Sequence, residues 1–200
     1  MTEEVQRNYL EINSIQDLNE VIEPTEDYSL NLLNPINFQL NKFFYKNIGK
    51  KHKWIDRLAW TENQWIDYVS NNKVKTYILK YKEELVGFFE LIFHFEKKEV
   101  EIAYFGLLEE FQNKKLGSYL LSEAIKISFE NNINRVWLHT CSLDHKNALN
   151  NYIARGMKIY KTEIGKGYRA LANISDHGGQ EVPHLHFHLF GGENVGRMVE

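Results

Sequence analysis

The stretch FGLLEEFQNKKLGSYLL, residues 105–121, decides the fold, because an apolar strand-like run, a polar turn and a helical pattern follow one another within it. The first turn of the predicted helix contains Gly117 and Ser118, and two lysines, Lys114 and Lys115, stand directly before it. Free backbone N–H groups at a helix start attract phosphate oxygens, and the helix dipole adds to this attraction. We therefore expect either a phosphate-binding loop or an ordinary strand-to-helix connection with solvated lysines.

This stretch lies in the middle of a regular order of predicted elements. A short strand is expected at 8–12, and the rest of 1–35 is polar and rich in turn residues. The last predicted helix begins at Asp144 and ends at Gly156. The other elements are helices at 38–50, 61–72 and 115–132, an antiparallel meander of strands at 74–81, 84–95 and 100–108, and strands at 135–141 and 157–164. This order predicts an α/β fold, in detail an α+β mixed sheet flanked by helices.

Length and composition limit the class of protein. Two hundred residues suit one domain with a short appendage, and 43% apolar with 26% charged residues is typical of a globular chain. A net charge of −3 argues against nucleic acid as a partner, and the longest apolar run is too short to span a bilayer. The single cysteine, Cys141, excludes an internal disulfide and favours a reducing compartment. We expect a cytoplasmic protein that binds neither nucleic acid nor membranes.

Gln112-Asn113-Lys114-Lys115-Leu116-Gly117 resembles the acyl-CoA loop of the GNAT acetyltransferase superfamily, whose pattern is Gln/Arg-x-x-Gly-x-Gly/Ala. Lys115 stands at the place of the first glycine. VEIAYFGLL at 100–108 resembles the family's fourth strand, whose splayed end pairs its backbone with pantetheine, and ALNNYIARGM at 148–157 resembles its last core helix. The likeness covers about residues 36–164, and we assign 1–164 to this domain.

This resemblance implies the fold of an acyl-CoA N-acyltransferase and acetyl-CoA as the cosubstrate. It implies direct transfer, in a ternary complex, to a primary amine of a small molecule or peptide. Cosubstrate binding is then expected at the loop and its flanks: Leu107, Leu108, Gln112, Asn113, Lys114, Lys115, Leu116, Gly117, Ser118 and His145. His145 occupies the place where the family usually has an asparagine.

Acetyl transfer to an amine needs a base for the ammonium proton and an acid for the departing thiolate. The resemblance implies that Tyr152, four residues before Gly156, is the acid; the alternative is a tyrosine that packs on the helix's apolar face. Glu101 alternates with apolar neighbours on a strand and could be the base, acting directly or through water; the alternative is a partly solvated glutamate. Glu90 is the reserve base, and His139 could also serve, as could His145.

Acceptor binding is expected where Trp54, Arg57 and Trp60 lie close together in the sequence. An arginine between aromatic rings could hold a substrate carboxylate, although tryptophans are more often part of a core. Glu90 could instead anchor a cationic amine.

Residues 167–200 have a different character. In VPHLHFHLF the histidines alternate with apolar residues, which on a strand places three imidazoles on one face. Such a face suits zinc, but no further ligand completes the set, so we expect no metal site. The segment resembles the C-terminal part of histidine triad (HIT) nucleotide-binding proteins, and the matching residues are Asn173, Gly179, Gln180, His184, His186 and His188.

That second resemblance implies that His186 is a nucleophile on a nucleotide α-phosphate. The family's N-terminal half has no counterpart upstream, so we expect 167–200 to be an incomplete fragment. A hairpin formed by 168–174 and 183–190 should extend the main sheet or pair with a second chain in a homodimer. Two alternatives to the transferase stay open: a histidine triad hydrolase or transferase acting on nucleotide phosphoramidates, and a module that binds CoA or nucleotide without turnover.

Overall fold

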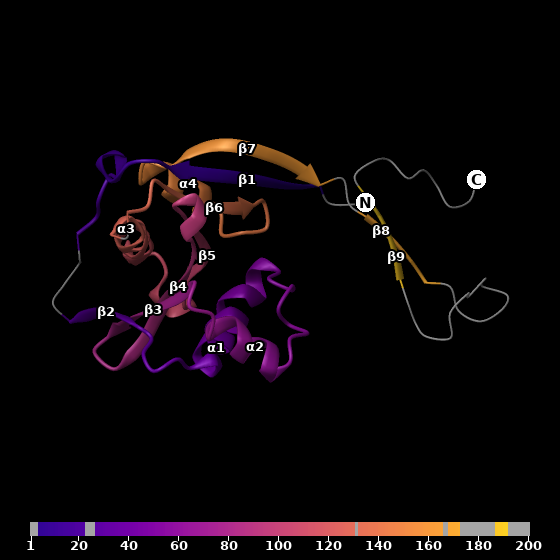
Figure 1. Ribbon diagram of the computed structural model, residues 1–200, viewed down its shortest axis with the longest axis horizontal. Coiled ribbons are helices and arrows are strands. Elements are labelled where there is room, and N and C mark those ends of the chain that lie inside the picture. Colours follow the sequence, from indigo (N-terminus) through magenta and orange to yellow (C-terminus); the bar gives the residue numbers. More distant parts are fainter. Residues whose placement is uncertain (1–3, 23–26, 131, 166–167, 173–186, 192–200) are drawn as a thin grey trace.

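The computed structural model describes residues 4–22, 27–130, 132–165, 168–172 and 187–191 (Figure 1). Its main body is a seven-stranded mixed sheet in the order β2-β3-β4-β5-β6-β1-β7. The strands are β1 Val5–Ile12, β2 Tyr28–Leu32, β3 Val74–Tyr81, β4 Glu84–His94, β5 Glu99–Leu107, β6 Arg135–Cys141 and β7 Lys158–Gly165. The α-helices are α1 Phe38–Gly49, α2 Glu62–Val69, α3 Leu116–Phe129 and α4 Ala148–Ala154. Short 3₁₀ helices are η1 Ile15–Asp17, η2 Lys50–His52, η3 Phe95–Lys97 and η4 Glu109–Phe111.

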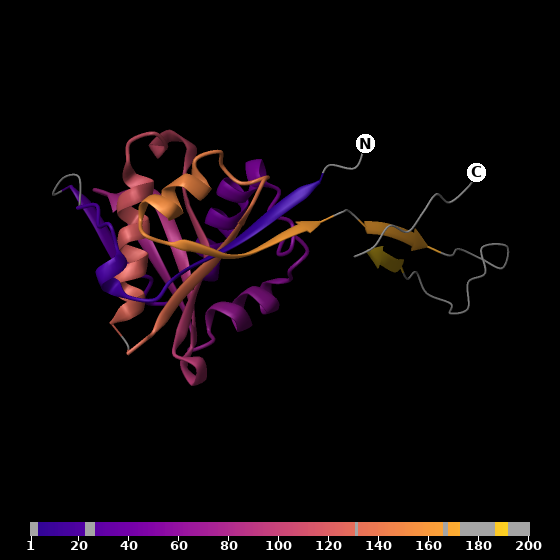
Figure 2. The same ribbon diagram turned by 90° about the horizontal axis from the view of Figure 1, so that it is seen from above.

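The helices cover the sheet on both sides, with α1 and α2 on one face and α3 and α4 on the other (Figure 2). The buried stripe of α3 includes Leu120, Ala124 and Ile125, whose side chains are fully buried in the common core. Removing each such side chain from water stabilises the fold by roughly 1.5–3 kcal/mol for a leucine or isoleucine. The α/β prediction of a mixed sheet flanked by helices is therefore confirmed.

Two elements differ from the sequence prediction near the N-terminus. The strand β1 begins at Val5 rather than Asn8, and β2 forms within the stretch expected to be turns. Apolar and polar residues alternate in β2, and Tyr28 and Leu30 pack against the core, but the strand is only five residues long and three of them are exposed. Antiparallel pairing with β3 at the edge of the sheet adds to its stability.

The helix expected to begin at Asp144 begins at Ala148. The Asp144 carboxylate accepts hydrogen bonds from the Cys141 backbone N–H at 2.9 Å and the Thr140 hydroxyl at 2.7 Å. An aspartate that bonds to preceding residues closes a turn rather than capping the helix that follows.

A separate two-stranded sheet pairs β8, Tyr168–Ala172, with β9, Phe187–Gly191. In the part of the chain that the structure describes, neither strand joins the main sheet. The expected extension of the main sheet by this hairpin is therefore wrong for the described residues, and pairing with a second chain stays a prediction.

Candidate active site

The centre of the sheet opens where β5 and β6 diverge. Their parallel pairing joins 99–101 to 135–137 and then stops, whereas β5 continues to pair with β4 on its other side. The β4 pairing skips Ala103, which bulges at the point of divergence. Beyond it lies a cavity of about 1180 Å³, which is lined along β5 from Ile102 to Leu107. Backbone groups of β5 that face this gap have no partner strand and can pair with an extended ligand.

One end of the cavity is formed by the loop after β5. Asn113 and Lys115 both line it and both have left-handed backbone angles, with φ of 63° and 62°. Lys115 therefore takes a left-handed conformation, which glycine adopts most readily. The helix α3 begins directly afterwards, so its first N–H groups lie beside the cavity.

The start of α3 is tied to α4 through side chains that face the cavity. The Ser118 hydroxyl donates to Asn151 Oδ1 at 2.8 Å, and Asn151 Nδ2 donates to the Gly117 carbonyl at 3.2 Å. A Cβ atom placed on Gly117 would meet only the Leu107 side chain, at 3.7 Å. The sequence analysis did not identify Asn151 as a residue of the site; its position next to Tyr152 was the only signal for it.

Seven of the ten residues predicted to bind the cosubstrate line the cavity: Leu107, Gln112, Asn113, Lys115, Gly117, Ser118 and His145. The other three do not. Leu108 and Leu116 are buried in the core, and the Lys114 ammonium lies 5.0 Å from the centre of the Phe111 ring.

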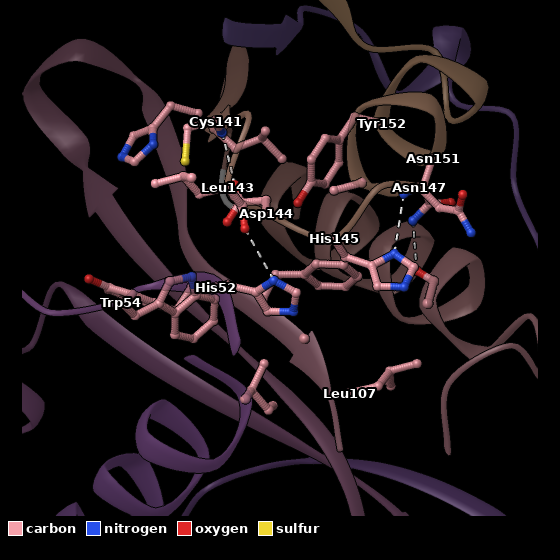
Figure 3. Close-up of a pocket in the computed structure, with 18 of the residues that line it drawn as sticks. His52, Trp54, Leu107, Cys141, Leu143, Asp144, His145, Asn147, Asn151 and Tyr152 are labelled. Atoms are coloured by element: carbon pink, nitrogen blue, oxygen red, sulfur yellow. Dashed lines mark hydrogen bonds between the residues drawn. The ribbon is translucent and has the colours of Figure 1, made fainter. Parts of the chain in front are cut away.

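The phenol of Tyr152 points from α4 into the cavity (Figure 3). Its ring packs edge-on against Phe105 of β5 with centroids 6.2 Å apart, and 8% of the residue is exposed. Burial raises the pKa of Tyr152 above its usual range, and the Asp144 charge adds to this shift. The phenol therefore stays protonated near neutral pH. Tyr152 thus both packs and lines the cavity, and its role as the acid stays a prediction.

The structure places Glu101 outside the lining of the cavity. It lies on the part of β5 that still pairs with β6, opposite Trp137, and its Oε2 is 3.7 Å from His94 Nε2. Burial raises the pKa of Glu101, as expected for a carboxylate among apolar neighbours. The position of Glu101 therefore gives no support to direct proton transfer from an acceptor in the cavity, and transfer through water stays a prediction.

His139 does line the cavity, from β6 beyond the point of divergence. Its ring lies 5.7 Å from that of Tyr9. Partial burial lowers the pKa of His139, and the charge of Arg7 lowers it further. A neutral imidazole can accept a proton, so His139, a further candidate base in the sequence, lines the cavity where neither Glu101 nor the reserve base Glu90 does.

The predicted acceptor residues separate into two groups. Trp54 lines the cavity. Arg57 and Glu90 are only 5% and 1% exposed and bind each other, because Arg57 Nη1 donates to Glu90 Oε2 at 2.9 Å. Asn41 and Tyr68 also donate to the Glu90 carboxylate. The two charges therefore stabilise the packing of α1 and α2 on the sheet, and neither faces the cavity.

The α1–α2 connection reaches across the cavity to the loop before α4. His52 Nδ1 lies 3.4 Å from the Leu143 carbonyl, and the rings of His52 and His145 are 6.2 Å apart. His145 Nδ1 accepts the Asn147 backbone N–H at 3.2 Å, which fixes its ring (Figure 3). Sequence reasoning missed His52, together with Arg7 and Asp56, which also line the cavity.

Of the histidine triad residues, Asn173, Gly179, Gln180, His184 and His186 lie outside the described residues, and His188 lies in β9 opposite Leu171. The described residues contain no cluster of three or more side chains suited to hold a metal ion. Among the same residues, no helix is long and apolar enough to cross a membrane.

Comparison with known proteins adds two findings. The "Acetyltransferase (GNAT) family" matches residues 37–157. A GCN5-related N-acetyltransferase from Sphaerobacter thermophilus shares the fold with a TM-score of 0.64 at 12% identity, over 80% of this chain and 50% of that one. A spermidine N-acetyltransferase from Vibrio cholerae, solved with CoA and spermine, has a TM-score of 0.54 at 17% identity, over 66% of this chain and 81% of that one.

The curated relatives belong to a different class of protein from the acetyltransferases. Purine nucleoside phosphoramidase of Escherichia coli K12 is 43% identical over 60 residues, which is 29% of this chain and 50% of that protein. An uncharacterized HIT-like protein of Buchnera aphidicola is 38% identical over 63 residues, 30% of this chain and 56% of that one. The chain thus spans about half the length of these relatives, and their names agree with the histidine triad resemblance.

Proposed function

The chain belongs to the GNAT acetyltransferase family, and from this premise we propose that it transfers an acetyl group from acetyl-CoA to a primary amine of a small molecule or peptide. One observation carries the proposal: β5 and β6 diverge around a cavity that has a helix start at one end and a buried, protonated phenol in its wall. This arrangement supplies phosphate binding, backbone pairing and an acid along one continuous channel.

Binding of acetyl-CoA follows from the two ends of that channel. The first N–H groups of α3 and the cation of Lys115 suit the pyrophosphate. The free edge of β5 suits the amide groups of pantetheine and can polarise the thioester carbonyl. The absence of a side chain at Gly117 leaves room for the phosphates to approach the backbone.

The proton balance gives roles to two side chains. The acceptor enters as an ammonium ion, and His139 takes one proton so that the nitrogen can attack the carbonyl carbon. As the C–N bond forms and the C–S bond breaks, the nitrogen passes its second proton to solvent and Tyr152 donates one to the sulfur. Tyr152 then regains a proton from solvent and His139 releases to solvent the proton that it took, so that one proton is released in total for each amide formed.

The test is release of free thiol from acetyl-CoA, measured across a panel of primary amines. Thiol release that depends on the amine, with the acetylated amine as product, supports the proposal. Tight CoA binding without turnover of any amine would instead favour a binding module.

A second candidate function is hydrolysis of nucleotide phosphoramidates, which the 43% identity to a phosphoramidase over 60 residues favours. A nucleophilic histidine needs a pocket that holds the phosphate in line, and the chain spans only half of that relative. We therefore expect little or no phosphoramidase activity, and acetyl transfer that is unchanged in His186→Ala. Strong phosphoramidase activity that disappears in this variant would make the second function the main one.

A further inference from the structure

We propose that Asp56 is a binding site for a second ammonium group of the acceptor, so that the preferred acceptors carry at least two amino groups. This inference rests on the proposed function, because it assigns the acceptor end of the same cavity. Asp56 lies on the α1–α2 connection and lines the cavity next to Trp54 and Ile55. Nothing in the sequence singled it out.

The Asp56 carboxylate is fixed by two phenols. The Tyr45 hydroxyl donates to Oδ1 at 2.8 Å, and the Tyr104 hydroxyl donates to Oδ2 at 2.5 Å. Tyr45 is held in turn by the Arg57 backbone N–H, which donates to its oxygen at 3.0 Å. A carboxylate has about four acceptor sites, so two sites remain for a ligand in the cavity.

This carboxylate is charged and forms no ion pair of its own. Burial alone would raise the pKa of Asp56, but the hydrogen bonds from Tyr104 and Tyr45, together with the charge of Arg57, lower it below its usual range. The neighbouring guanidinium of Arg57 is committed to Glu90. Within the described residues, Asp56 belongs to none of the ion pairs, so the negative charge of this exposed side chain faces the cavity. Such a charge favours a cationic ligand.

Aromatic rings beside Asp56 suit the same ligand. Trp54 lines the cavity, and its ring meets that of Tyr104 edge-on with centroids 4.8 Å apart. Aromatic faces attract ammonium groups through their quadrupole, so they add to the attraction of the carboxylate.

The bound ammonium cannot be the one that reacts. The reacting nitrogen must lose a proton before it attacks, whereas a carboxylate of low pKa is a weak base and stabilises the protonated amine. Asp56 therefore suits a nitrogen that stays charged, while a second nitrogen of the same molecule lies near His139 and Tyr152. Arg7 of β1 also lines the cavity, and its charge acts on His139 and on Glu163.

The experiment compares linear diamines of increasing length with monoamines of equal length, as kcat/KM for thiol release. Hydrogen bonds between charged groups of this kind change affinity about 10- to 100-fold. We expect the wild-type protein to prefer the best diamine by that factor, and Asp56→Asn to lose the preference through a higher KM. The matched control is Asp67→Asn, an exposed carboxylate on α2, which should keep the preference.

Calorimetric titration of the same amines into the CoA-bound protein separates the two proposals. A diamine that binds more tightly than its monoamine in the wild type, but not in Asp56→Asn, supports the site even if no amine turns over. Equal affinities and equal kcat/KM values for diamines and monoamines in the wild type would overturn it and leave acetyl transfer standing. If Asp56→Asn does not fold, this wild-type comparison decides alone.

Discussion

At the scale of single residues, the spacing within a motif predicts individual site residues. It does not predict contacts between residues that lie far apart in the sequence. Tyr152 could be predicted as a site residue because it stands four residues before Gly156 in the sequence. Gly156 itself has a φ of 97° and lies so close to the Asp17 carbonyl that a Cβ atom would not fit. Arg57 and Glu90 are separated by 33 residues, and nothing local indicates that they bind each other. Their burial as an ion pair is stable only because hydrogen bonds from the surrounding side chains complete it.

The residue-scale prediction concerns the acid. Tyr152→Phe keeps the ring that packs against Phe105 and removes only the phenolic proton, so we expect turnover to fall by on the order of 10²–10⁴. Affinity for CoA and the urea midpoint of unfolding should stay close to wild type. Because burial raises the pKa of Tyr152, wild-type kcat should show no loss from this group between pH 7 and pH 10.

Steady-state kinetics with a saturating amine checks the first expectation, and a pH profile of kcat checks the second. Wild-type turnover in the variant would reduce Tyr152 to a packing residue. If the wild-type kcat fell near pH 8 and that of Tyr152→Phe did not, the phenol would titrate near pH 8, which would contradict the second expectation.

At the scale of elements, helices with strong caps could be predicted and weakly marked strands could not. The capping box of Thr61 and Gln64 marks the start of α2, as the sequence predicted. The loop before α3 departs from the family pattern at Lys115, yet the backbone there is left-handed as a glycine would be. The sequence shows the residue change, but only the structure shows that Lys115 takes a left-handed backbone conformation.

The element-scale prediction tests this loop. Gly117→Val places a branched side chain in the cavity, where the phosphates would approach the start of α3, so we expect CoA affinity to fall by at least about 10-fold. The nearest side chain to the new Cβ is 3.7 Å away and valine is no worse a helix former than glycine, so stability should change by no more than roughly 1 kcal/mol.

Titration of CoA into both proteins, with urea unfolding beside it, measures the two quantities. Gly117→Ala, which adds only one methyl group, is the graded control and should have a smaller effect. Unchanged CoA affinity in the valine variant would show that the phosphates bind elsewhere.

At the scale of the whole molecule, the order of the strands could not be predicted from the sequence. The meander of β3, β4 and β5 is local and was predicted, because its strands are consecutive and joined by short turns. The first strand of the chain, β1, instead inserts between β6 and β7, more than 120 residues later, and brings Val5 and Arg7 to the cavity. Such long-range pairing depends on packing, which local patterns do not encode.

The prediction at this scale is that the fold depends on β1 and not on the hairpin. Leu10 is fully buried between β6 and β7, so Leu10→Ala should lower the free energy of unfolding by about 2–5 kcal/mol. Ile22, which is 82% exposed, is the matched control, and Ile22→Ala should change the free energy of unfolding by less than about 0.5 kcal/mol.

A chain that ends at Gly165 keeps every strand of the main sheet and the whole cavity lining, so its urea midpoint and thiol release should equal those of the full chain. A large loss of stability on that shortening would mean that the segment after β7 packs against the sheet, and that acetyl transfer and the histidine triad segment act as one unit.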